Sequence, residues 1–136
     1  MNEATRARYL KAALVGIGLV YVFGIYVCMR IWPDAWTWQP RHPAYEHMIL
    51  GVYATLGVFL ILAARQPTRH ASLIWFTVAS NLVHSGIMAA QAIATPVERG
   101  NFYGDIPALI IVALVLALLM PQASQARGAP TADSGV

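Results

Sequence analysis

Four long apolar runs, separated by short polar segments, dominate the pattern of residues along the chain. They cover residues 12–32, 46–64, 71–94 and 106–120. A helix on the surface of a soluble protein keeps one polar face, whereas these runs are apolar around most of the helix. About 20 such residues reach across the hydrocarbon layer of a membrane. We therefore predict an all-α fold, a four-transmembrane-helix bundle built from two helical hairpins.

The short segments carry signals that start or stop helices. Pro67 and Pro96 follow the second and third runs and stop those helices. Pro107 lies in the first turn of the fourth helix, where its missing N–H costs little. Asp105 is predicted to be the N-cap of the same helix. These signals divide the apolar runs into four separate helices.

The segment of residues 33–43 is rich in proline and tryptophan. Its three prolines disfavour a continuous helix, and Trp32, Trp36 and Trp38 stand close together along it. A Trp ring is apolar while its N–H stays hydrated, which suits the headgroup layer of a membrane. We expect this segment to lie along the membrane surface.

Lys and Arg are distributed unevenly between the two sides of the predicted bundle. Arg30, Arg41 and Arg99 lie on one side, and the other six of the nine lie on the opposite side, within residues 1–11, 65–70 and 121–136. The side richer in Lys and Arg is expected to be cytoplasmic. We predict an N-in/C-in, multi-pass protein of a bacterial inner membrane.

The predicted chain has three parts. Residues 1–11 form its cytoplasmic N-terminal segment, residues 12–120 its transmembrane domain, and residues 121–136 a disordered cytoplasmic tail.

Composition excludes several classes of protein. Hydrophobic residues make up 58% of the chain and charged residues only 11%, whereas a soluble domain averages roughly a quarter charged residues. The net charge of +3 is too small and too scattered for a nucleic-acid surface. The single cysteine, Cys28, permits no disulfide within the chain. The phosphate-binding, serine-hydrolase and zinc-protease motifs are absent from the sequence.

The third predicted helix carries a polar stripe. Thr77, Asn81, His84, Met88 and Gln91 fall within an arc of about 80° when the chain turns 100° per residue. Polar side chains at membrane depth are rare and often functional. They also hold helices together through hydrogen bonds, and the pattern is compatible with either role. Small residues occupy the opposite side (Ala79, Gly86, Ala89 and Ala90). We therefore expect this helix to be packed on two sides.

Two other helices could add polar groups to this stripe. Glu46 and Tyr53 share one face of the second helix, and Tyr21 lies on the first. Glu46 could close an outward-facing pocket, or it could be a first-turn carboxylate stabilised by the helix dipole. Tyr21 and Tyr53 could supply phenols to an internal cavity or simply pack. The candidate ligand-binding residues are His84, Asn81, Met88, Gln91, Glu46 and Tyr53.

The stripe also suggests a binding site for a soft metal ion such as copper. His84 and Met88 are four residues apart, and an imidazole with a thioether suits a soft metal. The sequence contains no HxxxH or CxxC pair, and a haem with two axial histidines needs a second histidine at the depth of His84. We therefore predict no metal site. The sequence assigns no cofactor and no catalytic residue.

Several segments together resemble a known family. They are Tyr45-Glu46-His47-Met48, residues 51–57, residues 63–67, residues 72–77 and the stretch that begins His84-Ser85-Gly86. The chain resembles, over about residues 20–120, a family of small bacterial four-helix membrane proteins known only as a domain of unknown function. The resemblance implies the fold and implies no activity.

Two functions remain open at this point. The first is a non-enzymatic bundle that binds a lipophilic small molecule or serves as an accessory subunit of a larger membrane complex, with the lipid bilayer, a second copy or other membrane subunits as partners and no nucleic acid. The second is a membrane enzyme that acts on a lipophilic substrate by proton transfer. His84 would be its acid or base, Asn81 or Tyr53 a hydrogen-bond donor, and Glu46 a second carboxylate. The two hypotheses differ in whether His84 and Glu46 border one cavity.

Overall fold

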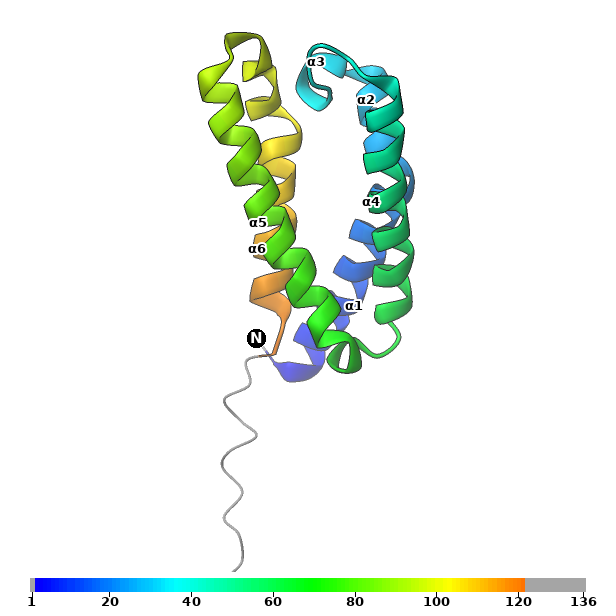
Figure 1. Cartoon of the computed structure of the whole chain (residues 1–136). Helices are drawn as coiled ribbons and strands as arrows, with labels where there is room; N and C mark the ends of the chain where they lie inside the picture. Colours follow the sequence, from blue (N-terminus) through cyan, green and yellow to red (C-terminus); the bar gives the residue numbers. More distant parts are fainter. Residues whose placement is uncertain (1, 122–136) are drawn as a thin grey trace, which may run out of the picture.

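The computed structural model describes residues 2–121, and their regular structure is entirely helical. Its long helices run side by side along one axis (Figure 1). In chain order the elements are α1 (Glu3–Leu19), the π-helical turn η1 (Val20–Gly24), α2 (Ile25–Ile31), α3 (Pro33–Trp36), α4 (Pro43–Ala63), the 3-10 turn η2 (Pro67–His70), α5 (Ala71–Ala94), the 3-10 segment η3 (Pro96–Tyr103) and α6 (Asp105–Leu119).

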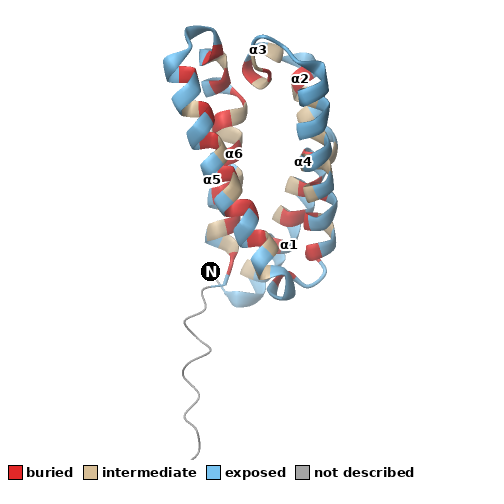
Figure 2. Ribbon diagram, in the orientation of Figure 1, coloured by how far each residue is buried: buried red, intermediate tan, exposed pale blue. Residues whose placement is uncertain are grey.

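The predicted membrane-spanning architecture is confirmed in its main features. Four helical stretches within the described residues are long and apolar enough to cross a membrane: Glu3–Ile31, Pro43–Ala63, Pro67–Ala94 and Pro96–Leu119. Figure 2 shows buried residues turned inward and exposed residues over the outer faces. Many exposed residues are large and apolar, for example Phe23, Ile87 and Leu118. Such a surface is suited to lipid.

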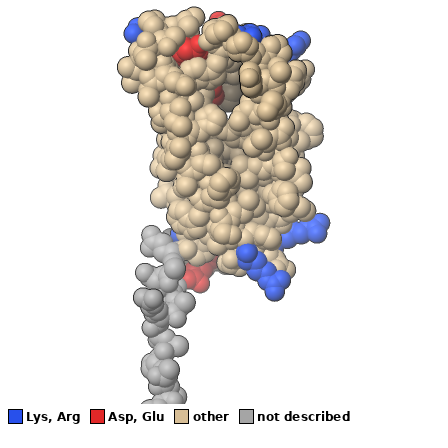
Figure 3. Space-filling view, in the orientation of Figure 1, with Lys and Arg blue, Asp and Glu red and all other residues tan. Residues whose placement is uncertain are grey.

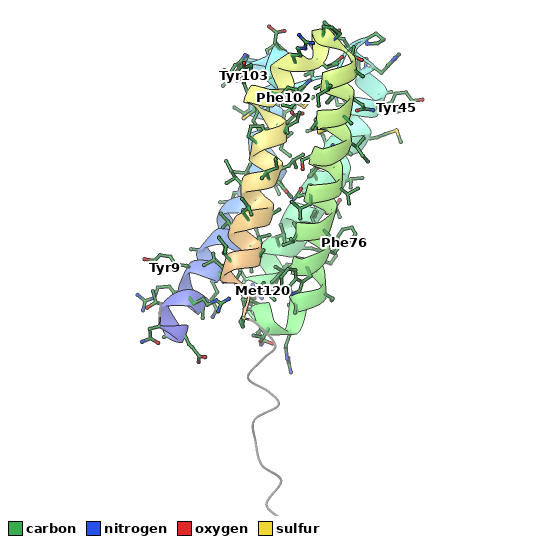
Figure 4. All side chains as sticks on the ribbon, turned by 90° about the vertical axis from the view of Figure 1, so that its left-hand side faces the viewer. Tyr9, Tyr45, Phe76, Phe102, Tyr103 and Met120 are labelled. Carbon is green, nitrogen blue, oxygen red and sulfur yellow. The ribbon has the colours of Figure 1, made fainter. Side chains whose placement is uncertain are left out.

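Aromatic side chains project at both ends of the bundle. Tyr9 is exposed near the start of α1, whereas Tyr45 and Tyr103 are exposed at the opposite end, as Figure 4 shows. Amphipathic rings at these two levels are typical of the two interfaces of a membrane. The apolar outer surface lies between them.

The bundle consists of two helical hairpins. The α1–η1–α2 stretch packs on α4, and α5 packs on α6. The hairpins meet at one end, where α1 contacts α6, and again at the other end, where α3 lies on η3. Between these two contacts they stand apart (Figure 1).

Two glycines allow α1 and α4 to approach closely. A Cβ atom added to Gly18 would lie 2.7 Å from the carbonyl oxygen of Gly57. A Cβ atom added to Gly57 would lie 2.6 Å from the carbonyl oxygen of Gly18. Because helices in lipid associate through close van der Waals packing, small residues at such a crossing stabilise the hairpin.

The end opposite α3 is closed by an apolar core. Leu14, Leu60, Ile74 and Leu116 are fully buried there and come from α1, α4, α5 and α6. Arg6 joins the first and last helices at this end, because its guanidinium donates to the carbonyl oxygens of Leu118, Leu119 and Met120 at the end of α6. A cation is favourable at the C-terminus of a helix, where carbonyl groups lack partners within the helix.

The α3 end is held by a buried polar network. Glu98 is 3% exposed, and its carboxylate accepts from the backbone N–H of Gln39 at 2.8 Å and from Asn101 Nδ2 at 3.2 Å. Gly104, the residue directly after η3, has no room for a side chain, because Ala35 of α3 lies against it. The segment after α3 is therefore fixed to η3, across the gap between the hairpins.

The predicted helix boundaries agree closely with the structure, with three corrections. The third helix has the predicted bounds, whereas α1 extends back to Glu3, into the predicted N-terminal segment. Asp105 is the first residue of α6 and not its N-cap, which is Gly104. The fourth spanning stretch begins at Pro96, before the predicted run of residues 106–120, because residues 96–103 form the 3-10 segment η3. The predicted disordered tail lies, after residue 121, outside the described residues.

The prediction that the third helix is packed on two sides is wrong within one chain. Ala79, Gly86 and Ala90 are exposed, and nothing lies within 4 Å of a Cβ atom added to Gly86. Only the face with the polar stripe is buried, through Thr77, Asn81 and other residues. Small residues in a membrane helix fit lipid as well as another helix, so their presence alone did not identify a second contact face.

Candidate ligand-binding cavity

A cavity of about 340 Å³ lies between the two hairpins, beneath α3 and the segment that follows it. Figure 3 shows the surface hollowed on this side of the molecule, between the hairpins. The lining is predominantly apolar and combines all four membrane-spanning stretches with the Trp-rich segment. Apolar residues of the wall include Val20, Ile25, Met29, Ile49, Leu50, Met88, Ala108, Leu109 and Val112.

The π-helical turn η1 places Tyr21 at the deep end of the cavity. Tyr21 is 3% exposed, and its hydroxyl donates to Asn81 Oδ1 at 2.9 Å and accepts from Asn81 Nδ2 at 2.7 Å. Asn81 is itself 1% exposed. Because a π turn changes the direction in which side chains leave a helix, such turns are frequent at functional sites. This pair links the first hairpin to α5.

A second tyrosine makes a parallel link one turn further along α5. The Tyr53 hydroxyl and His84 Nδ1 share a hydrogen bond of 3.1 Å. The Tyr53 ring also meets the Tyr21 ring edge to face, with centroids 5.0 Å apart. When the Tyr53 hydroxyl donates to Nδ1, the other ring nitrogen of His84, Nε2, carries the proton and can donate. No hydrogen bond joins Nε2 to a described residue, so it remains available to a ligand.

Two carboxylates border the outer part of the cavity. Glu46 on α4 forms an ion pair with Arg41, whose Nε lies 3.2 Å from Glu46 Oε1. Asp105 lies at the start of α6 with the Trp38 side chain beside it. Its Oδ1 atom is buried and has no hydrogen-bond partner among residues 2–121. The outer wall therefore holds Glu46, which has an ion-pair partner, and Asp105, one of whose oxygen atoms has no hydrogen-bond partner.

The Trp-rich segment covers the cavity. Trp36, Thr37 and Trp38 line it, and Thr37 is 4% exposed. The hydrogen bond from Gln39 N to the buried Glu98 holds this segment against η3. The sequence predicted that this segment lies along the membrane surface. In the structure, Trp36 and Trp38 of the segment also line the cavity.

Four of the six candidate residues from the sequence line this single cavity: Glu46, Tyr53, His84 and Met88. Asn81 does not line it but holds Tyr21, which does. Gln91 is exposed and does not line it, so the polar stripe does not face one site along its whole length. The structure thus brings together side chains from α4 and α5 as the sequence suggested.

Several lining residues were not among the candidates. Asp105 was interpreted only as a helix cap, and Trp36 and Trp38 only as residues of the membrane interface. The signal for Asp105 was a carboxylate beside a long apolar run, since an ionisable group next to the membrane interior often has a functional role.

His84 and Met88, the pair that suggested a metal site, both line the cavity, and so does Met29. His47 and Met48 are exposed, whereas His84 and Met88 face the cavity. Within residues 2–121, no group of three or more His, Cys, Asp and Glu side chains comes together in a way that could hold a metal ion. The side chains that line the cavity offer hydrogen-bonding groups, carboxylates and apolar contact.

Comparison with known proteins places the chain in a family without assigning an activity. Searches of curated proteins and of solved structures found no significant match. A family model matches residues 4–135, which is nearly the whole chain. This match agrees with the resemblance in the sequence and with the four apolar helices. The chain therefore belongs to the family of unknown function DUF6632.

Proposed function

We propose that this protein binds a lipophilic small molecule in the cavity between its two hairpins. The observation that carries the proposal is the cavity itself, with about 340 Å³ of space, an apolar wall and a few polar side chains directed into it. Pockets of this kind, mostly apolar with a small number of convergent polar groups, are typical of small-molecule sites. The position of the cavity among four apolar helices favours a ligand that dissolves in the membrane.

Access from the lipid supports the same class of ligand. Val20 and Ile49 line the cavity and are 48% and 42% exposed. Tyr45 also lines it and is 69% exposed on the outer surface of α4. The cavity therefore reaches a surface that faces lipid, through which a lipophilic molecule can enter sideways. The Tyr53–His84 pair then offers a hydrogen bond at the inner end.

The alternative is an enzyme that transfers protons on a lipophilic substrate. The favourable observation is that Glu46 and His84 border one cavity and that His84 Nδ1 is bonded to the Tyr53 hydroxyl and not to a helix backbone. Asn81 is occupied by Tyr21, so Tyr53 would be the hydrogen-bond donor of such a site. This hypothesis requires the bound molecule to be chemically changed, which the binding hypothesis does not.

Gentle purification followed by mass spectrometry of the extracted small molecules tests both functions. Two variants of α6 provide matched samples: Val112 lines the cavity, whereas the adjacent Ile111 is 59% exposed on the outer face. We expect a lipophilic compound with the parent and with Ile111→Trp, and loss of that compound with Val112→Trp, because a Trp ring would fill the cavity.

The other outcomes separate the remaining hypotheses. A parent protein that carries no lipophilic compound, or a Val112→Trp variant that retains it in full, would overturn the binding proposal. Conversion of the recovered compound on incubation with the parent, but not with His84→Leu, would favour the enzyme. A second protein that copurifies in a fixed ratio would favour an accessory subunit of a larger complex.

We also propose that the termini face the cytoplasm and that the membrane is a bacterial inner membrane. The excess of Lys and Arg on the side that includes Arg6, Arg65 and Arg69 supports this orientation. Figure 1 supports the grouping, because the start of α1 and the end of α6 lie at one end of the bundle. Reporter fusions after Gln66 and at Val136 should be active in the cytoplasm and a fusion after Gln39 outside; the reverse pattern would contradict the orientation.

A further inference from the structure

The charged groups that line the cavity are of one sign. Asp105 and Glu46 are carboxylates, and no Lys or Arg is among the described residues that line the space. The nitrogen-bearing titratable side chains in the lining are the imidazoles of His42 and His84. An anionic ligand would therefore meet the Asp105 carboxylate with no Lys or Arg in the lining to balance its own charge, since the Arg41 guanidinium is paired with Glu46.

Asp105 differs from Glu46 in what surrounds it. Glu46 has Arg41 as an ion-pair partner at 3.2 Å. Asp105 has no ion pair with a described residue, and its buried Oδ1 lacks even a hydrogen-bond donor within residues 2–121. The N-terminus of α6 favours a negative charge at this point but leaves that oxygen without a partner.

Aromatic rings face the same part of the cavity. Trp36, Trp38 and Tyr45 line its outer end, and the Trp38 side chain lies beside Asp105. The face of an aromatic ring carries a partial negative charge and attracts a cation, most strongly when the ring is Trp and the site excludes water. Aromatic rings that line the same cavity as a carboxylate without an ion-pair partner are suited to an organic cation.

We propose, on the basis of the lipid-accessible cavity of the proposed function, that the ligand is a lipophilic cation such as a hydrophobic amine or a quaternary onium compound. Its charged group lies between the Asp105 carboxylate and the rings of Trp36 and Trp38. Its apolar part lies deeper, against Leu109 and Val112. A neutral lipophile would fill the same space but bring no charge to balance that of the Asp105 carboxylate, which lines the cavity and has no ion-pair partner among the described residues.

Tetraphenylphosphonium and tetraphenylborate test this proposal, because they have nearly the same size and shape and opposite charge. Binding of each is measured by calorimetry with the full chain in lipid nanodiscs, after subtraction of empty nanodiscs. We expect saturable binding of the phosphonium and none of the borate. Asp105→Asn should weaken phosphonium binding about tenfold or more, a size expected for the loss of one charge contact in an apolar site, whereas Asp105→Glu should retain most of it.

Asp34→Asn is the matched control, because Asp34 is an exposed carboxylate of α3 that does not line the cavity. It should bind the phosphonium like the parent. Equal binding by the parent and Asp105→Asn would overturn the proposal, as would equal binding of phosphonium and borate. If both ions bind equally and Val112→Trp abolishes both, the lipophile site stands and the preference for a cation is wrong. If neither ion binds and no lipophile copurifies, both proposals fail.

Discussion

The two ends of the bundle are packed in different ways. At the end opposite α3, the four membrane-spanning stretches meet through fully buried Leu14, Leu60, Ile74 and Leu116. Toward α3, the same helices stand apart around a cavity of about 340 Å³. Beside the contact of α3 with η3, two hydrogen-bonded pairs join the hairpins there, Tyr21 with Asn81 and Tyr53 with His84.

The difference shows what each kind of contact can do inside a membrane. Apolar side chains bring helices together only by close packing, because lipid is as apolar as they are. A hydrogen-bonded pair of long side chains joins two helices at a distance and leaves space beside it. The closed end therefore holds the hairpins together, and the polar pairs keep the open end at a defined width. Three sets of variants can separate these roles.

The largest effect is expected at the crossing of α1 and α4. Gly57→Ala places a Cβ atom 2.6 Å from the Gly18 carbonyl oxygen and 2.9 Å from Tyr21 Cβ, so the helices must move apart. We expect the free energy of unfolding to fall by about 1–3 kcal/mol, as is usual for overpacked interiors. Thermal unfolding in detergent, followed by circular dichroism, measures the change.

Gly51→Ala is the control on the same helix. Nothing lies within 4 Å of a Cβ atom added at Gly51, so this change should leave stability unchanged or raise it slightly through the better helix propensity of Ala. If Gly57→Ala unfolds at the same temperature as Gly51→Ala, the two helices do not cross at these glycines, and the closed end is packed differently.

A smaller effect is expected at the outer limit of the closed end. Arg6→Gln removes charged hydrogen bonds to the carbonyl groups of Leu118 and Leu119, at 3.1 Å and 3.0 Å, and with them the tie between the first and last helices. We expect a loss of about 1 kcal/mol, since the group is only partly buried. Arg8→Gln, at an exposed position of the same helix, should have no effect. Equal unfolding temperatures for the two variants would show that the tie does not contribute to stability.

The sequence predicted the closed end better than the open one. Helix positions depend on the lengths of the apolar runs and on local stop signals such as Pro67 and Pro96, and the run of residues 71–94 agrees with α5 at both ends. The 3.6-residue period also placed Asn81 and His84 on one face, and both are bonded to tyrosines of the first hairpin. These features are local, so a single sequence contains them.

The width of the open end could not be predicted in the same way. It depends on the π turn at Val20–Gly24, on the contact of Gly104 with Ala35 and on the burial of Glu98, all of which involve segments distant in sequence or have no periodic signal. Ala79 and Gly86 suggested a second contact face, but small residues are equally compatible with lipid. Asp105 was recognised as part of a helix start, and only the fold shows that it borders a cavity.

The smallest change in stability is expected at the polar pairs, where the two members of the α5 stripe should behave differently. Asn81→Leu and His84→Leu should both insert normally, because Leu enters lipid more readily than either polar residue. Asn81 is 1% exposed, and its amide is hydrogen-bonded to the Tyr21 hydroxyl. Asn81→Leu removes this hydrogen bond and should lower the free energy of unfolding by about 0.6–1 kcal/mol. His84 faces the cavity, so His84→Leu should leave stability unchanged or raise it.

Retention of the copurified lipophile gives the complementary measurement for the same two variants. His84→Leu should lose it, because the ligand loses the free Nε2 nitrogen and the Tyr53 hydroxyl loses its orientation. Asn81→Leu should retain more, since Asn81 does not line the cavity. Val83→Leu, at a position 62% exposed to lipid, should change neither measurement. If His84→Leu instead lowers stability as Asn81→Leu does and keeps its ligand, both pairs serve only to join the hairpins. If both variants match the parent in stability and ligand content, the polar pairs neither hold the open end nor bind a ligand there.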